Sequence, residues 1–159
     1  MMSETEFNTT VETYMDTLYR TALNYLRDSG AAEDVCQEAF LRLYRRSPSF
    51  DSEEHKRYWL LHVTVNECRR VLASPWHKMS YLEDLPDLPG PAEPGEENVF
   101  RAVMDLPRKY RIVLHLYYFE GYSTKEIAGL LSRKPATVRS QLDRGRELLK
   151  QRLLEEEHV

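Results

Sequence analysis

The segment of residues 81–98, YLEDLPDLPGPAEPGEEN, constrains the fold more than any other part of this sequence. It holds four prolines, two glycines and six acidic residues, and it contains no basic residue. Proline breaks helices, and like charges repel one another into an extended chain. The composition therefore predicts an acidic, proline-rich linker that cannot sustain a helix and that joins two small domains, residues 1–80 and 99–159.

The sequence before the linker predicts three helices. Apolar residues in residues 11–25 follow an i, i+3, i+4, i+7 pattern, and residues 35–44 carry a second, wider apolar stripe. The stretch DSGAAED between them is expected to interrupt the helical pattern. A third helix is expected to begin after Ser52 as its N-cap and to end near Ser74. These patterns predict a three-helix domain.

The sequence after the linker also has helical patterns. Two short helices are expected in residues 99–105 and 108–119, with a break at Pro107. A Ser-x-x-Glu capping box at Ser123 begins a third helix, and Pro135 suits the first turn of a fourth. Strand-like alternation of useful length is absent from the sequence. We therefore predict an all-α fold in which the C-terminal domain ends in a helix-turn-helix.

Several classes of function find no support in the sequence. The five histidines are not organised by a nucleophile elbow, a phosphate loop or metal-ligand spacing, so we expect no catalytic site, cofactor or metal. Cys36 and Cys68 lie in helical stretches without a CxxC pair and are expected to be buried thiols. No apolar run or signal-peptide pattern is present, so we expect a cytoplasmic protein that does not insert into a membrane.

The distribution of charge is more informative than the total. The chain has a net charge of −4, but residues 99–154 contain twelve basic and only five acidic residues. A basic surface on a piece of domain size is typical of a nucleic-acid binder. A solvated helical surface would carry the same charges, so this balance alone leaves both interpretations open.

The helix expected after Pro135 has the features of a recognition helix, which enters the DNA major groove by its N-terminal end. Ala136 would let the backbone approach the duplex, and an arginine would offer a fork to guanine O6 and N7. Val138, Leu142 and Gly145 line the opposite side. An ordinary helical hairpin is the alternative. The candidate DNA contacts are Lys134, Ala136, Thr137, Arg139, Ser140, Asp143 and Arg144.

Residues 106–149, LPRKYRIVLHLYYFEGYSTKEIAGLLSRKPATVRSQLDRGRELL, resemble the promoter-reading domain of bacterial RNA polymerase sigma factors of the extracytoplasmic-function (ECF) group. Residues 18–46, LYRTALNYLRDSGAAEDVCQEAFLRLYRR, and residues 58–70, YWLLHVTVNECRR, resemble the polymerase-binding half of the same group. The matches come in the family's order around a linker. A stand-alone helix-turn-helix regulator is the alternative, but it would not be expected to carry the N-terminal motifs.

The sequence departs from the family pattern on the helix expected to read DNA. Ala136 stands where glycine is usual, Gln141 where arginine is usual, and Gly145 where alanine is usual. Asp143 puts an acid on the reading face, where it would repel phosphate and could accept a hydrogen bond from a cytosine amino group. We expect these changes to leave the fold intact and to alter the promoter sequence that is read.

One surface of the second helix mixes acidic, amide, apolar and aromatic groups at spacings of three and four residues. A solvated helix face is one interpretation. The resemblance implies instead that this face contacts the coiled coil of the polymerase's largest subunit, whereas Phe40 is expected in the core. The candidate polymerase contacts are Asp34, Gln37, Glu38, Leu41 and Tyr44.

The loop SPSFDS, residues 47–52, precedes a stretch in which aromatic and basic residues alternate, as single-stranded DNA binding requires. Burial of the aromatic residues in the core is the alternative. The resemblance implies that Phe50 and Asn66 form the pocket for a base flipped from the minus-ten element. Two interpretations of Trp76 stay open, a second base contact and a structural cap. The candidate minus-ten contacts are Phe50, Lys56, Trp59, Asn66, Arg69 and Arg70.

The resemblance implies a function without chemistry of its own. Residues 1–80 would be sigma region 2, which binds core polymerase and melts the minus-ten element, and residues 99–159 would be sigma region 4, which reads the minus-thirty-five element. The expected partners are core RNA polymerase, promoter DNA as duplex and as melted strand, and an anti-sigma factor. The acidic linker would thread the channel that RNA later occupies, and a passive spacer is the alternative.

Overall fold

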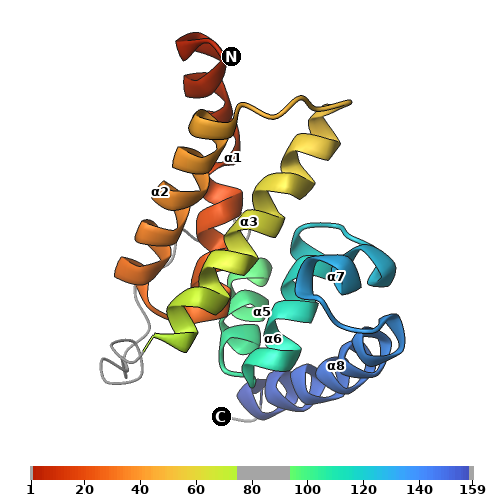
Figure 1. Ribbon diagram of the computed structural model, residues 1–159. Coiled ribbons are helices and arrows are strands. Elements are labelled where there is room, and N and C mark those ends of the chain that lie inside the picture. The colour runs from red at the N-terminus through yellow and green to blue at the C-terminus, as the bar shows by residue number, and fades with distance from the viewer. Residues whose placement is uncertain (1, 75–93, 158–159) are drawn as a thin grey trace. The chain divides into compact units, whose positions relative to one another are not determined.

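The computed structural model of the chain describes residues 2–74 and 94–157. Within these two ranges every regular element is helical and no strand is present. The helices that precede residue 75 belong to one compact unit, and those from residue 94 onward belong to a second. Figure 1 labels the helices in chain order. The expected all-α fold with two small helical domains is confirmed.

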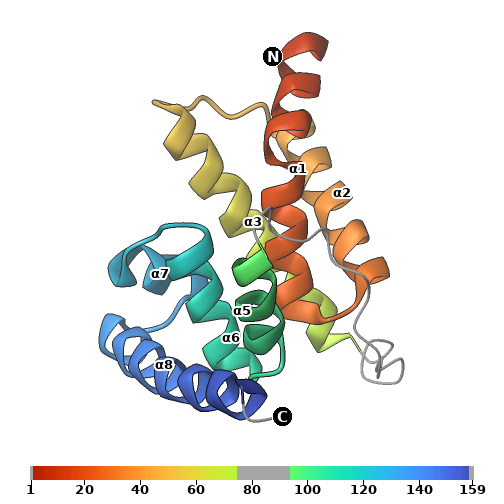
Figure 2. The same ribbon diagram turned by 180° about the vertical axis from the view of Figure 1, so that it is seen from behind.

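The N-terminal unit consists of α1 (Glu4–Leu26), α2 (Ser29–Arg46) and α3 (Glu53–Ala73). Each of the three helices packs against the other two, and both views of the ribbon show them side by side (Figures 1 and 2). The third helix has the expected N-cap, because the Ser52 side chain accepts a hydrogen bond from the His55 N–H. The predicted three-helix arrangement is therefore present.

The interruption between α1 and α2 is shorter than the sequence indicated. Arg27 takes the left-handed conformation and ends α1, and the Asp28 carboxylate accepts the Ala31 N–H at the start of α2. The stretch DSGAAED was expected to interrupt the helical pattern as a whole, and that expectation is wrong after Asp28. A strong N-cap lets the residues that follow it enter the helix, even though serine and glycine are among them.

The core of the N-terminal unit is built from apolar side chains of all three helices, among them the fully buried Leu18, Leu43 and Leu60. Cys36 and Cys68 are buried free thiols, as the sequence predicted. Burial raises the pKa of the Cys36 thiol to about 12, so this thiol stays protonated at neutral pH. Phe40 is 4% exposed and belongs to the core, also as expected.

The C-terminal unit begins with α5 (Pro94–Met104) and α6 (Arg108–Leu114). The start of α5 at Pro94 contradicts part of the linker prediction, because the last five residues of the expected linker are helical. Proline has no N–H to lose in the first turn of a helix, and its fixed φ suits that position. The rest of the predicted linker lies outside the described residues, and so does Trp76.

A π-helical turn, η1 (His115–Phe119), follows α6 directly. The sequence pattern predicted one uninterrupted α-helix across this stretch, and periodicity alone does not distinguish an α-turn from a π-turn. Gly121 then adopts φ +78°, a conformation that glycine adopts readily, and the chain turns toward α7 (Thr124–Leu131) and α8 (Pro135–Glu157). The helix α8 packs against α5, α6 and α7.

Candidate nucleic-acid interface

The helices α7 and α8 form the expected helix-turn-helix. The Ser123 side chain accepts the Glu126 N–H, and the Glu126 carboxylate accepts the Ser123 N–H, which completes the predicted capping box. Ser132 ends α7 in the left-handed conformation. Within the turn, Arg133 donates to the Gln141 side-chain oxygen at 2.8 Å and to the Lys109 carbonyl at 3.2 Å. Arg133 therefore ties the turn to α6 and, through the unusual Gln141, to α8.

The two sides of α8 are separated as the sequence indicated. Val138 and Leu142 are buried, and Gly145 packs so closely on α6 that an added methyl carbon would lie 3.2 Å from Leu114 Cδ1. All seven candidate DNA contacts are exposed, and those on α8 lie within its first three turns. They are Lys134, Ala136, Thr137, Arg139, Ser140, Asp143 and Arg144.

The charged residues on this surface differ in how they are held. Arg144 pairs with Glu147 at 3.0 Å, and Asp143 pairs with Arg146 at 3.3 Å. The structure records no hydrogen bond or ion pair between Arg139 and any other described residue. Since Asp143 has a cationic neighbour, its charge is partly offset within the protein. The repulsion that the sequence predicted between Asp143 and a phosphate group would therefore be weaker than expected.

Two arginines of α8 have structural contacts that sequence reasoning did not identify. Arg152 pairs with Asp105 at 2.8 Å and so links α8 to the residue that follows α5. Arg146 donates its Nε hydrogen to the Tyr118 hydroxyl at 2.5 Å. This hydrogen bond raises the pKa of Arg146 above its usual value. Tyr118 comes from η1, and no sequence signal indicated the π-turn that places it beside α8.

The outer face of α2 carries the five candidate polymerase contacts. Asp34 and Gln37 are exposed, and Glu38 is half-buried. Leu41 and Tyr44 stand out as large apolar side chains that remain 43% and 46% exposed. The five residues share one face of α2, and this face combines charged, amide and large apolar side chains.

An ion-pair network connects this face of α2 with α3. Arg42 pairs with Glu38 at 3.3 Å on its own helix and also with Glu67 of α3. The Glu67 side chain is only 3% exposed, and its second oxygen pairs with Arg70 at 3.0 Å. A buried carboxylate is stable only when such partners offset its desolvation. Sequence reasoning missed Glu67 because a single acid on a helix gives no sign of burial.

The loop after α2 packs its aromatic ring on α3. The Phe50 ring lies 5.7 Å from the Trp59 ring and 5.2 Å from the His55 ring, both in edge-on geometry. Trp59 is half-buried, so it is neither a full core residue nor a free surface ring. Arg69 is half-buried as well, and Asn66 and Arg70 are exposed. Trp59, Asn66 and Arg70 follow one another at helical spacing along α3.

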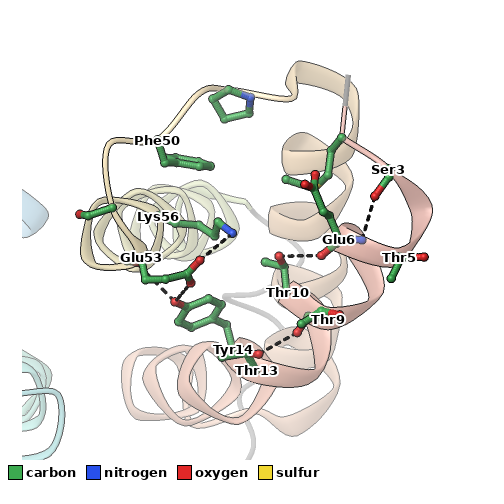
Figure 3. A pocket seen from close by; sticks show the side chains of 13 residues that line it. Ser3, Thr5, Glu6, Thr9, Thr10, Thr13, Tyr14, Phe50, Glu53 and Lys56 are labelled. Carbon is green, nitrogen blue, oxygen red and sulfur yellow. Dashed lines mark hydrogen bonds and ion pairs between the residues drawn. The ribbon is translucent and has the colours of Figure 1, made fainter.

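A pocket of about 580 Å³ opens between this loop and the start of α1. Figure 3 shows Phe50 and Lys56 on one side and the threonines of α1 on the other. Lys56 is held there by Glu53 at 3.2 Å, and the Tyr14 hydroxyl donates to Glu53 at 2.7 Å. The bonds from Tyr14 and Lys56 lower the pKa of Glu53. Asn66 is not among the lining residues, so the structure does not bring it together with Phe50 in this pocket.

The described part of the chain gives no indication of other sites. No group of His, Cys, Asp or Glu side chains in residues 2–74 and 94–157 could hold a metal ion. Of the helices that are described, none combines the length and the apolar character needed to cross a membrane.

Comparison with known families matches both units. Residues 10–77 match the family model of sigma-70 region 2, and residues 96–149 match that of sigma-70 region 4. The ECF sigma factor SigW of Bacillus subtilis is 30% identical, over 90% of this chain and 86% of SigW. The ECF sigma factor SigM of the same organism is 31% identical, over 86% of this chain and 88% of SigM.

A probable RNA polymerase sigma factor of Xanthomonas campestris pv. campestris, RfaY, is 33% identical, but this chain spans only 38% of its length. Two solved structures share the fold. The sigma factor RpoE, in complex with the anti-sigma factor NepR from Bartonella quintana, has a TM-score of 0.70 at 21% identity, over 92% of this chain and 96% of that one. CnrH, in complex with the cytosolic domain of CnrY, has a TM-score of 0.65 at 20% identity, over 97% and 90%.

The comparisons do not favour a stand-alone helix-turn-helix regulator, because the region 2 match and the SigW and SigM alignments extend through the N-terminal unit. The helix-turn-helix thus lies in the same chain as an N-terminal unit that matches sigma-70 region 2. This chain belongs to the extracytoplasmic-function group of the sigma-70 family of RNA polymerase sigma factors.

Proposed function

We propose that this ECF sigma factor binds core RNA polymerase through the outer face of α2, opens the minus-ten element with α3 and its preceding loop, and reads the minus-thirty-five element with α8. It contributes binding energy and no chemistry of its own. The observation that carries the assignment is that Lys134 and the six candidate DNA contacts at the start of α8 are all exposed, in a chain that also carries region 2.

The polymerase contact is assigned to α2 because of its two exposed apolar side chains. Leu41 and Tyr44 are large and accessible, and they are flanked by Asp34, Gln37 and Glu38. Aromatic residues are enriched at protein interfaces, where a desolvated apolar centre with a polar rim gives most of the affinity. This composition fits a protein partner better than it fits DNA, because the two acids, Asp34 and Glu38, would repel the phosphate backbone.

The melting function is assigned to α3 and the loop before it. Phe50 and Trp59 offer aromatic rings on which bases can stack, while Asn66 supplies both a donor and an acceptor to a base edge. Arg69 and Arg70 would follow the phosphate backbone. Because Phe50 and Lys56 line one pocket and Asn66 lies further along α3, we assign them to different nucleotides of the melted strand.

The minus-thirty-five contact is assigned to α8. The residues at its start are small or polar and exposed, and its first N–H groups are available to phosphate. Arg139 and Arg144 reach toward base edges, and Lys134 lies beside the helix start, where it would meet the backbone. We assign residues 1–80 to the polymerase-binding domain and begin the promoter-reading domain at Pro94, where α5 starts.

We further propose an anti-sigma factor as a partner. RpoE and CnrH, which share this fold, were each solved in complex with another protein, and the partner of RpoE is an anti-sigma factor. A protein that covered α2 and α8 would block polymerase and DNA together. Because polymerase and promoter DNA are cytoplasmic in bacteria, we place the protein in the cytoplasm.

Run-off transcription with reconstituted core polymerase and a library of promoter sequences tests the function. We expect initiation from a subset of promoters that share two elements at fixed spacing. Core polymerase alone and core polymerase with a variant lacking residues 94–159 serve as controls. If the complete protein adds no sequence-specific initiation to core polymerase, the proposed function is wrong.

A further inference from the structure

Arg146 is held by an unusual number of contacts for a side chain on an exposed helix face. Its Nε donates to the Tyr118 hydroxyl at 2.5 Å, and its guanidinium lies over the rings of Tyr117 and Tyr118, 5.4 and 5.6 Å from their centroids. Its Nη1 lies 3.3 Å from the Asp143 carboxylate. An arginine held on aromatic faces loses much of its freedom before it meets any further partner.

The aromatic side of this cluster depends on the π-turn η1. Successive side chains on an α-helix point about 100° apart, and the wider π-turn reduces that angle. The rings of Tyr117 and Tyr118 lie 5.0 Å apart in edge-on geometry, and both contact Arg146. His115 and Leu116 anchor the same turn in the core. A π-turn is rare and is found frequently at functional sites.

Asp143 lies on the side of α8 that carries the candidate DNA contacts. It follows Ala136 by seven residues and Arg139 by four, so the three share one helix face. Its side chain is 77% exposed. An exposed ion pair at a spacing of three residues is normally mobile and contributes little. The contacts to Tyr117 and Tyr118 remove that mobility from the arginine and so define where the carboxylate lies.

We propose that Tyr118 and Arg146 are positioning residues that hold Asp143 to select a cytosine in the minus-thirty-five element. A carboxylate accepts a hydrogen bond from the cytosine N4 amino group in the major groove. Arg146 offsets the repulsion between this carboxylate and the phosphates. The proposal rests on the proposed role of α8 and deepens it, because it names the base that one position prefers.

The experiment measures binding of the full-length protein, as holoenzyme, to promoters in which each base pair of the minus-thirty-five element is varied. Asp143→Ala should remove the preference for cytosine at one position, a change of about 5- to 100-fold in relative affinity. Arg146→Ala should reduce the same preference, and Tyr118→Phe should reduce it about 2- to 5-fold, because only the hydroxyl is lost.

Tyr117→Phe is the matched control. Tyr117 contacts Arg146 through its ring, and the structure records no hydrogen bond from its hydroxyl to any other described residue. The control should therefore keep the wild-type preference. Tyr118→Phe in an Asp143→Ala background should have no further effect on preference, because the tyrosine acts through the carboxylate. Circular dichroism of each variant checks that the helices remain folded.

Two results would overturn the proposal and leave the role of α8 intact. One is an unchanged base preference in Asp143→Ala while Arg139→Ala relaxes the preference at its own position. The other is equal weakening of all promoters by Arg146→Ala, which would make Arg146 a phosphate contact. If no variant of α8 changes any base preference, the proposed role of α8 fails as well.

Discussion

In the N-terminal unit the buried Glu67 joins Arg42 of α2 to Arg70 of α3, whereas in the C-terminal unit Arg139 has no recorded bond to another described residue. The first arrangement makes a surface charge part of the structure that holds two helices together. The second leaves the charge available to a ligand. The charges of Arg42 and Arg139 therefore have different structural roles, although both residues lie on small helical units.

This difference has a practical consequence for substitutions. In the N-terminal unit, Lys56 and Arg70 are candidate DNA contacts that also pair with Glu53 and Glu67, so their loss changes stability and binding together. On the first turns of α8, a substitution can change binding alone. The stability of the N-terminal unit can be measured separately, because both tryptophans, Trp59 and Trp76, precede the C-terminal unit. Tryptophan fluorescence therefore follows the N-terminal unit in the intact chain.

The largest effect is expected from Arg42→Ala. The variant leaves the carboxylate of Glu67, which is 3% exposed, with Arg70 as the remaining partner in the network. Loss of a charged partner from a buried acceptor costs about 2 to 3 kcal/mol of unfolding free energy. Urea unfolding followed by tryptophan fluorescence measures this loss for the N-terminal unit.

Arg45→Ala is the control for that experiment, because Arg45 is exposed on the same helix and the structure records no ion pair between it and any described residue. It should change stability by less than about 0.5 kcal/mol. The double variant Arg42→Ala/Glu67→Ala should lose less than the sum of the two single losses, since each removes the same interaction. An Arg42→Ala variant as stable as Arg45→Ala would contradict the buried network.

The second prediction compares Arg139 with Arg152 on α8. Arg139→Ala should cost about 1 to 3 kcal/mol at one base pair of the minus-thirty-five element and relax the preference there. Arg152 is already paired with Asp105 at 2.8 Å, so Arg152→Ala should leave base preference unchanged and at most lower the stability of the C-terminal unit slightly. Holoenzyme binding to promoters scanned base by base, at two salt concentrations, measures both variants.

An equal loss of affinity on all promoters from both variants would mean that the arginines act through general electrostatics. In that case the salt dependence should fall by about one unit for each arginine removed. Arg144→Ala adds an intermediate case, because Arg144 pairs with Glu147 on the exposed surface but remains near the candidate contacts. Its effect on base preference should resemble that of Arg139→Ala, since an exposed pair of this kind exchanges readily.

The sequence predicted those features of the fold that local rules determine. The capping box at Ser123, the N-cap at Ser52 and the buried side of α8 follow from residue type and spacing, and all are present. The π-turn at His115–Phe119 and the helical start at Pro94 were missed, because apolar periodicity tolerates a wider turn and proline is compatible with both a linker and a helix start.

The candidate site was only partly accessible to the same reasoning. The exposure of the residues at the start of α8 followed from helical spacing. Tyr118 and Arg146 are in contact although they are 28 positions apart in the sequence. Glu67 is paired with Arg42, which is 25 positions away. Such pairings depend on how helices pack, and one sequence does not contain that information. The roles of the candidate residues in binding stay predictions.

The third prediction concerns alkaline pH and the N-terminal unit. Burial and the hydrogen bond to Glu53 raise the pKa of Tyr14 to about 12. Because the unfolded chain releases this proton near pH 10, the contribution of Tyr14 to stability is complete below pH 10 and is lost between pH 10 and about 12. Urea unfolding at several pH values, followed by tryptophan fluorescence, should show a shallower decline over that range for Tyr14→Phe than for the wild type.

Cys36 provides the control for the alkaline experiment, since burial raises the pKa of its thiol to about 12 as well. The unfolded thiol ionises near pH 8.5 to 9, so its contribution begins to fall at a lower pH than that of Tyr14. Cys36→Ala should therefore change the decline from about pH 9 upward, and Tyr14→Phe only from about pH 10. Identical profiles for the wild type and Tyr14→Phe would show that the Tyr14 hydroxyl is not held as the structure places it.

The smallest effect is expected from Gly145→Ala, which changes the packed side of α8 and leaves its exposed side untouched. Glycine inside a helix is less favourable than alanine by about 0.5 to 1 kcal/mol. The new methyl carbon would lie 3.2 Å from Leu114 Cδ1 and 3.4 Å from Tyr110 Cβ, which is closer than the usual optimum of about 3.5 to 4.0 Å between carbons. The closest atoms belong to the buried Leu114 side chain, which has to move by only a few tenths of an ångström, so part of the gain in helix propensity should survive. We expect a net gain of less than about 1 kcal/mol, measured by circular dichroism in thermal unfolding, with tryptophan fluorescence unchanged as the internal control for the N-terminal unit.

The base preference of the holoenzyme should also stay the same, because no exposed residue of α8 is altered. A loss of stability would show that α6 and α8 are packed too rigidly to adjust, and a changed base preference would show that the two sides of α8 are not independent.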